Sequence, residues 1–248
     1  MVLKLLLRMI LLIRGLLLPF WLAIYTAICC TSVLVAIFIL RSRFIEYFLL
    51  RIWAKHIVWV VGLRLHVTGL DKIPPQGVLF IFNHQSLLDI PVIHSAIPRD
   101  LRFGAKIELF SIPIFGRTMR AMRVLPIPRG QREEAIRVLE RSAVRIKKGE
   151  SFILAPEGTR QKENQLGEFR SGPFILSIQA GCPLVPVVLR GIHDVLPKNS
   201  LLIHTCRWVT DVNVDILDPI NGAEFNFPQR EDFKKLARDR MLVRFLNN

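Results

Sequence analysis

The feature that most constrains this chain is a stretch from Gly15 to Leu40 that contains no charged residue. As an α-helix it would extend roughly 37 Å, against a membrane hydrocarbon core of roughly 30 Å. A secretory signal peptide would have a shorter apolar core and a small-residue cleavage site, whereas this run ends at Arg41 and Arg43. Buried helices of soluble proteins seldom stay uncharged over such a length. We therefore expect a helix that is embedded in a membrane and retained.

The residues that follow predict a second, amphipathic helix, from Phe44 to Leu65. Its large apolar side chains are interrupted by Arg51, Lys55 and His56, a mixture that is typical of a helix lying at the membrane interface. Basic residues flank the uncharged run on both sides, so the positive-inside rule gives no orientation. We expect residues 1–66 to form a membrane anchor, and the pattern fits a hairpin in one leaflet as well as a full span.

The charge of the chain favours an anionic membrane as a partner. A formal net charge of +14 accompanies a mean hydropathy of +0.37, and half of that charge lies in residues 1–66. The bases are dispersed among apolar residues, not clustered on a polar face with stacking aromatic rings, which argues against nucleic-acid binding. The four cysteines form no C-x-x-C pair. We therefore expect neither a disulfide scaffold nor a metal site.

Residues 67–248 show short apolar runs alternating with helical patterns, which predicts an α/β domain. The clearest helix runs from Gln131 to Lys148, with acids in its first turn and bases in its last. A second helix is expected to open at Gly172 and to end at Gly181. The expected strands are Val78–Phe82, Leu101–Gly104, Val124–Ile127, Ser151–Ala155, Leu184–Leu189 and Thr210–Leu217.

Polar residues directly after the expected strand Val78–Phe82 are the first candidates for chemistry, because open α/β sheets place their sites at strand ends. His84 and Asp89 would lie roughly 140° apart on a helix, so they can meet only if the chain turns between them. Asp89 would then hold His84 as a general base. The spacing alone is weak evidence, since His66 and Asp71 share it as a strand and a turn residue. His84 could instead cap the following helix.

The segment Pro156–Arg160, after another expected strand, has the composition of an anion-binding loop. Gly158 permits a positive φ and exposes backbone N–H groups, Thr159 adds a hydroxyl, and Arg160 presents a planar fork that matches a phosphate. The alternative is a plain turn in which Arg160 pairs with Glu157. Two further cations between these segments, Lys106 and Arg129, could equally be solvated surface charges.

Taken in order and spacing, these segments resemble the motifs of the glycerolipid acyltransferases, most closely the bacterial 1-acyl-sn-glycerol-3-phosphate acyltransferases. The N-H-x-x-x-x-D motif matches Asn83–Asp89, and P-E-G-T-R matches Pro156–Arg160 without a change. An apolar V-P-V strand matches Val185–Val187. The remaining motif, K-x-E-L with a downstream P-x-x-G and an arginine, matches Lys106, Glu108, Leu109, Pro113, Gly116 and Arg129. The resemblance spans roughly residues 69–191.

This resemblance implies a mixed sheet flanked by helices and a role for each motif residue. His84 would be the general base and Asp89 would orient it. The phosphate of the acceptor would be held by Lys106, Arg129 and Arg160, in a pocket shaped by Glu157, Gly158 and Thr159. The chain has no G-x-S-x-G nucleophile elbow, so direct attack on a thioester is favoured over an acyl-enzyme intermediate.

The resemblance also implies a reaction in phospholipid biosynthesis. A fatty acyl group would pass from acyl-CoA or acyl-carrier protein to the sn-2 hydroxyl of lysophosphatidic acid, giving phosphatidic acid, without a cofactor. The expected location is the cytoplasmic (inner) membrane, with the catalytic domain on the cytoplasmic face. One alternative is the same chemistry on glycerol 3-phosphate or another lysophospholipid. Another is a non-catalytic membrane protein that binds anionic lipid. After Gly191 no further motif is recognised.

Overall fold

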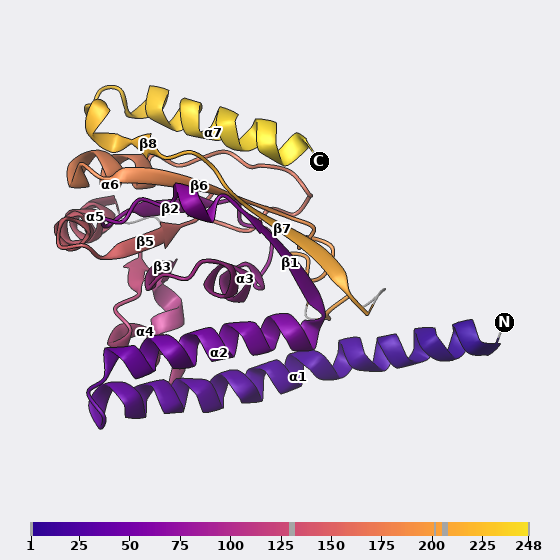
Figure 1. Cartoon of the computed structure of the whole chain (residues 1–248). Coiled ribbons are helices and arrows are strands. Elements are labelled where there is room, and N and C mark those ends of the chain that lie inside the picture. The colour runs from indigo at the N-terminus through magenta and orange to yellow at the C-terminus, as the bar shows by residue number, and fades with distance from the viewer. Residues whose placement is uncertain (1, 129–131, 201, 205–207, 248) are drawn as a thin grey trace.

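Two long helices lie along one side of an α/β unit in the computed structural model, which describes residues 2–128, 132–200, 202–204 and 208–247 (Figure 1). The first helix, α1, spans Val2–Phe38 and the second, α2, spans Arg43–Val61. They pack against each other side by side. The apolar run predicted from Gly15 to Leu40 is therefore helical almost to its end.

The second helix ends earlier than its predicted limit at Leu65. Gly62 caps α2 in the left-handed conformation, at φ 79°, and its N–H donates to the carbonyl of Trp59. The strand β1 (Leu63–Thr68) begins at the next residue and contains His66, an expected strand residue; the predicted helix included the first residues of this strand. The expected division at His66 consequently falls inside a strand of the sheet.

Within the described residues, eight strands form one mixed sheet in the order β1-β7-β6-β2-β5-β3-β4, with β8 paired to β6. Strands β6, β2, β5, β3 and β4 are parallel, whereas β7 runs antiparallel to β6 and pairs in parallel with β1. The expected mixed sheet is confirmed. The other strands are β2 (Leu79–Phe82), β3 (Leu101–Lys106), β4 (Leu125–Ile127), β5 (Ser151–Leu154), β6 (Pro183–Arg190), β7 (Thr210–Ile216) and β8 (Ile220–Asn221).

The predicted strands and helices agree with the structure to within a few residues, because each has an apolar pattern that matches its burial. All four residues of β2 are buried, as expected for a central strand covered on both faces. The helix that ends at Gly181 has that glycine in the left-handed conformation, at φ 60°. The remaining helices are α3 (Asp89–Ala96), α4 (Phe115–Ala121), α5 (Arg132–Lys147), α6 (Gly172–Ala180) and α7 (Arg230–Leu246), with short 3₁₀ turns at Leu70–Lys72, Ile107–Ser111 and Gly222–Glu224.

Each face of the sheet has its own hydrophobic core. Phe80 and Phe82 of β2 point to the face covered by α2 and α3, together with Leu18 of α1. The alternate residues Leu79 and Ile81 pack on the other face, which is covered by α5, α6 and α7. The two N-terminal helices therefore share a core with the α/β unit on one side only.

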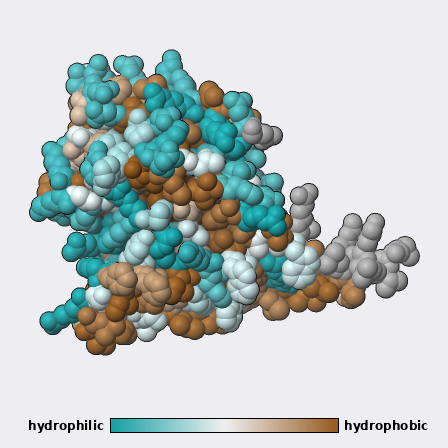
Figure 2. Space-filling model, in the orientation of Figure 1, coloured by the Kyte–Doolittle hydropathy of each residue, from teal (hydrophilic) through white to brown (hydrophobic). Residues whose placement is uncertain are grey.

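The lower edge of the molecule in Figure 2 is hydrophobic, and it coincides with α1 and α2. Met9–Phe38 is the one helical stretch in the described part of the chain that is long and apolar enough to cross a membrane. Many of its large side chains are exposed, including Leu12, Leu17, Phe20, Ile24, Ile28 and Phe38. This surface has the character of one that contacts lipid.

Candidate active site

Asp89 and His84 meet at the carboxyl end of β2, as the sequence predicts for a chain that turns between them. The distance from His84 Nδ1 to Asp89 Oδ2 is 2.7 Å. The same oxygen accepts the backbone N–H groups of Gln85, at 2.8 Å, and Ser86, at 3.0 Å. Three donors on one carboxylate oxygen thus fix the turn that leads into α3. No side chain caps this helix, so the alternative of a helix-capping His84 does not apply.

The surroundings of the pair determine which imidazole nitrogen faces a substrate. The Asp89 side chain is fully buried, whereas that of His84 is 19% exposed. An ionised carboxylate only accepts hydrogen bonds, so this contact favours the neutral tautomer in which Nδ1 carries the proton and Nε2 has a lone pair. The Phe82 ring packs edge-on against the imidazole, with 5.5 Å between ring centroids. The arrangement suits a general base that acts through Nε2.

Asn83 anchors the start of this turn, a role that the motif did not reveal. Its side chain is fully buried; Nδ2 donates to the carbonyl of Leu189 at 2.8 Å, and Oδ1 accepts the N–H of Leu189 at 2.7 Å. The side chain amide therefore continues the pairing of β2 with β6 beyond its last backbone pair, Phe82 with Val187. The sequence signal that could have indicated this role is a polar residue placed directly after a buried strand.

The loop after β5 holds the backbone of His84 from the other side. Glu157 Oε1 accepts the N–H of His84 at 3.2 Å, and the N–H of Gln161 donates to the carbonyl of His84 at 2.9 Å. Glu157 is 4% exposed. Burial raises the pKa of the Glu157 carboxyl to about 7, and the nearby amides of Gln161 and His84 oppose that shift only in part. Both loops are thus joined at the histidine.

The P-E-G-T-R segment forms a turn whose glycine has a positive φ. Gly158 has φ 70°, and a Cβ there would lie 2.8 Å from Nε of Arg170. Thr159 accepts a hydrogen bond from Lys198 at 3.2 Å. In the described part of the chain, Arg160 forms no ion pair with Glu157 or with another acid. Arg160 is half-buried, and a guanidinium without an acidic partner is suited to bind an anion.

Of the other two predicted phosphate ligands, the structure describes only Lys106. Lys106 is the last residue of β3, and its Nζ lies 3.1 Å from Glu108 on a half-exposed side chain. Arg129 lies outside the described residues. His84, Asp89 and Glu157 are the predicted site residues in direct contact with one another. Among the residues described, no three His, Cys, Asp or Glu side chains gather where they could hold a metal ion.

Comparisons with known proteins identify relatives that match more than half of this chain. The curated relatives include a chloroplastic 1-acyl-sn-glycerol-3-phosphate acyltransferase from Brassica napus, 32% identical over 82% of this chain and 58% of the relative. Another, from Pseudomonas aeruginosa, is 30% identical over 59% of this chain and 58% of the relative. The chain thus spans little more than half the length of the curated relatives it matches.

The crystal structure of the 1-acyl-sn-glycerophosphate acyltransferase PlsC from Thermotoga maritima superposes with a TM-score of 0.80. At 24% identity, over 94% of this chain and 95% of that one, it shows that the two share a fold, including the N-terminal helices. The model of the acyltransferase family matches residues 64–190, which run from β1 to the end of β6 and contain every motif residue. Because this match covers half of the chain, the protein belongs to the acyltransferase family.

Proposed function

We propose that this protein is a membrane-bound 1-acyl-sn-glycerol-3-phosphate acyltransferase. It transfers a fatty acyl group from acyl-CoA or acyl-carrier protein to the sn-2 hydroxyl of lysophosphatidic acid, forming phosphatidic acid. The observation that carries this proposal is the buried Asp89 that holds His84 beside the Pro156–Arg160 loop. The names of the curated relatives support the choice of acceptor.

In the proposed reaction, His84 Nε2 removes the proton of the acceptor hydroxyl while the hydroxyl oxygen attacks the thioester carbonyl. Asp89 accepts the hydrogen bond of Nδ1–H and stabilises the imidazolium that forms. The tetrahedral intermediate then expels the thiolate, which takes the proton back from Nε2 and leaves as a thiol. The thioester is already activated, so the enzyme needs no acyl intermediate of its own.

Acceptor binding is assigned to the cations of the motifs. Arg160 has no acidic partner among the described residues and lies two residues after Gly158, so it is the leading ligand for the acceptor phosphate. Lys106 would exchange its ion pair with Glu108 for the phosphate, and Arg129 would complete the group. Gly158 and Thr159 shape the pocket, and no cofactor is required.

The anchor is proposed to lie in one leaflet of the cytoplasmic membrane, with the catalytic unit on the cytoplasmic face. Thr118 of α4 donates to the carbonyl of Cys30 in the second half of α1, at 3.4 Å. The buried residues Val33 and Ala36 also lie in that half. A full span by α1 would therefore draw the attached α/β unit into lipid. A hairpin whose exposed face enters one leaflet avoids that cost.

The experiment uses the full-length protein in phospholipid vesicles with palmitoyl-CoA or palmitoyl-carrier protein, and an acceptor panel of lysophosphatidic acid, glycerol 3-phosphate and lysophosphatidylcholine. We expect phosphatidic acid from lysophosphatidic acid. His84→Ala should lower the rate by about 10²- to 10⁴-fold. His66→Ala, at the other histidine with the same spacing to an aspartate, should leave it within about twofold. Efficient transfer by a folded His84→Ala variant, or a preference for another acceptor, would overturn the proposal.

A further inference from the structure

A cavity adjoins the loop that contains His84. It has a volume of about 540 Å³, and its lining includes Glu157, Gln161, Gln165, Glu168, Arg170 and Arg238. Two of these residues also hold His84, since Glu157 accepts its N–H and the backbone of Gln161 donates to its carbonyl. The cavity is therefore joined to the candidate active site through the residues that fix the histidine.

The two arginines of this cavity come from different elements and are held in place differently. Arg238 of α7 donates hydrogen bonds from Nε to the carbonyl of Gly167, at 3.3 Å, and from Nη2 to the carbonyl of Leu166, at 3.2 Å. Its Nη1 group can still donate to a ligand. The guanidinium of Arg170 lies against Gly158 and has no hydrogen bond or ion pair in the described part of the chain. A pair of guanidinium groups with spare donors is suited to a phosphate.

The rest of the lining is suited to a polar but uncharged chain. Gln161 and Gln165 carry side chain amides that both donate and accept hydrogen bonds. Leu166 and Phe169 add apolar surface from the core of the α7 face. Glu157 and Glu168 are the acids of the lining. The cavity thus combines a cationic part with amide and apolar parts, unlike a site for a small inorganic anion.

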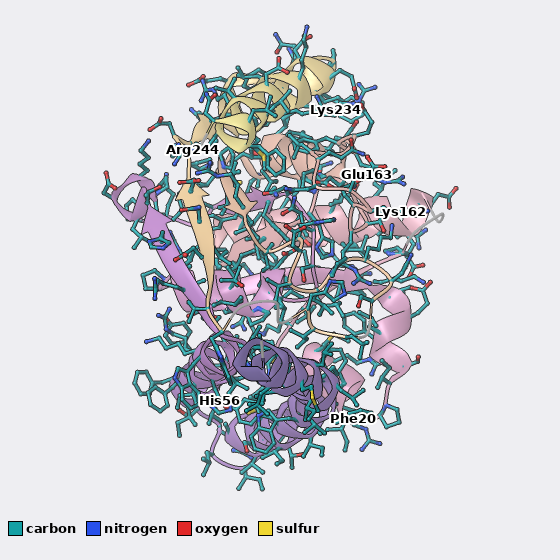
Figure 3. All side chains as sticks on the ribbon, turned by 90° about the vertical axis from the view of Figure 1, so that its right-hand side faces the viewer. Phe20, His56, Lys162, Glu163, Lys234 and Arg244 are labelled. Carbon is teal, nitrogen blue, oxygen red and sulfur yellow. The ribbon has the colours of Figure 1, made fainter. Side chains whose placement is uncertain are left out.

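The position of the cavity separates it from the lipid-facing surface. Arg238 belongs to α7, which covers the face of the sheet opposite to α1 and α2. In Figure 3, Lys162 and Glu163 of the same loop lie nearer to Lys234 of α7 than to Phe20 and His56 of the anchor. Under the proposed function, lysophosphatidic acid arrives from the membrane side, whereas the acyl donor is soluble and must arrive from the aqueous side.

We propose that this cavity binds the phosphopantetheine arm of the acyl donor, with Arg170 and Arg238 holding its phosphate and Gln161 and Gln165 pairing with its amides. The inference rests on the proposed function and names the donor subsite of the same active site. Coenzyme A and acyl-carrier protein present the same arm, so one cavity serves both. Glu157 lines the cavity and accepts the backbone N–H of His84, so the cavity lies next to the residue whose imidazole the thioester end must reach.

The test compares Arg170→Gln with Lys162→Gln, an exposed cation of the same loop that is outside the cavity lining. We expect Arg170→Gln to raise the KM for palmitoyl-CoA about tenfold or more and to leave the KM for lysophosphatidic acid unchanged. Lys162→Gln should change neither. Palmitoyl-carrier protein should show the same rise in KM, because it carries the same phosphate.

A donor without the phosphate makes the test specific. Palmitoyl-pantetheine should react with wild type and Arg170→Gln at equal rates, since the variant has no phosphate contact to lose. Arg238→Gln should behave like Arg170→Gln when thermal unfolding shows that α7 remains packed. A second readout, free of catalysis, is thermal stabilisation by 4′-phosphopantetheine, expected for wild type and lost in Arg170→Gln.

The inference would be overturned if Arg170→Gln left the donor KM unchanged, raised the KM for lysophosphatidic acid instead, or slowed palmitoyl-pantetheine as much as palmitoyl-CoA. A rise in KM for palmitoyl-CoA alone, without one for the carrier protein, would also overturn it, because the residue would then contact the adenosine part. An inactive wild type would contradict the proposed function, and phosphopantetheine stabilisation would still test the cavity.

Discussion

Two histidines in this chain are each followed five residues later by an aspartate, and only one of the pairs forms a contact. His84 lies after the last residue of β2, so the chain turns at once and Asp89 returns to Nδ1 at 2.7 Å. His66 lies within β1, which continues to Thr68, and its Nε2 contacts Asp211 of β7 at 2.8 Å. Asp71 lies in the 3₁₀ turn Leu70–Lys72 and takes no part.

The comparison shows that this spacing brings the two side chains together only when the strand has already ended before the histidine. An extended strand rises about 3.3 Å per residue and carries the partner away, whereas a tight turn brings it back. Burial separates the pairs as well. The Asp89 side chain is fully buried, while those of His66 and Asp211 are 49% and 57% exposed. Solvent screens the second pair, and the first is isolated from water on the aspartate side.

The largest expected difference in the rate of acyl transfer is between variants that replace the aspartate of each histidine–aspartate pair by asparagine. Asp89→Asn should lower the rate of acyl transfer by about 10²-fold or more, because an amide no longer selects the tautomer with a free Nε2. Asp71→Asn should leave the rate unchanged within about twofold, since Asp71 does not contact His66. Initial rates with saturating lysophosphatidic acid and palmitoyl-CoA measure both. Equal activities of the two variants would remove Asp89 from the proposed mechanism.

A second prediction concerns Glu157, which supports His84 but not His66. Because burial raises the pKa of the Glu157 carboxyl to about 7, the folded state binds a proton there that the unfolded state has lost. This contribution to stability is complete below the ordinary pKa of a glutamate, and it disappears as the pH rises through about 7. Glu157→Gln, which mimics the neutral form, should therefore gain stability relative to wild type at pH 8, on the order of 3 kcal/mol.

Denaturant unfolding of the detergent-solubilised protein between pH 4.5 and 8 measures this difference. Glu163→Gln, at an exposed position of the same loop, is the control and should follow wild type across the range. A Glu157→Gln variant that runs parallel to wild type at every pH would show that the carboxyl is charged in the folded protein, and the histidine loop would then carry a buried charge.

Most of this fold was predictable because burial follows local pattern. The strands β2, β5 and β6 are continuous apolar runs, and α5 has a charged face and an apolar stripe. His66 was expected in a strand, but the start of β1 was not predicted although the signals were present: Gly62 ends the preceding helix, and Leu63, Leu65 and Val67 alternate with polar residues. The apolar residues before Gly62 favoured a helix that continues to Leu65, so these signals were not used.

The candidate site was predictable only in part, because half of it depends on contacts between distant residues. The motif positions His84, Asp89 and Glu157 were identified, and the structure brings them together. No local pattern pairs Asn83 with Leu189 or places Arg238 of α7 against Gly167, since each contact joins segments more than 70 residues apart. Such contacts follow from the order of strands in the sheet.

A third prediction tests the fixed start of the histidine turn. Asn83→Ala leaves the buried N–H and carbonyl of Leu189 without partners, so it should lower the free energy of unfolding by about 2 kcal/mol. Asn213 of β7, the register partner of His66, is only half-buried, and Asn213→Ala should cost less than about 1 kcal/mol. Denaturant unfolding compares them. Similar losses would mean that Asn83 does not tie β2 to β6.

The smallest effect on stability is expected from changing Asp211, the residue that His66 contacts. Asp211→Asn removes an exposed contact with His66 and a longer one, of 3.6 Å, with Arg64. Exposed pairs of this kind contribute about 0–1 kcal/mol, and salt weakens them further. We expect a change in unfolding free energy within that range, smaller at high ionic strength, and no change in the rate of acyl transfer. If Asp211→Asn instead slowed transfer as strongly as Asp89→Asn, burial and a strand end would not be what distinguishes the two histidines.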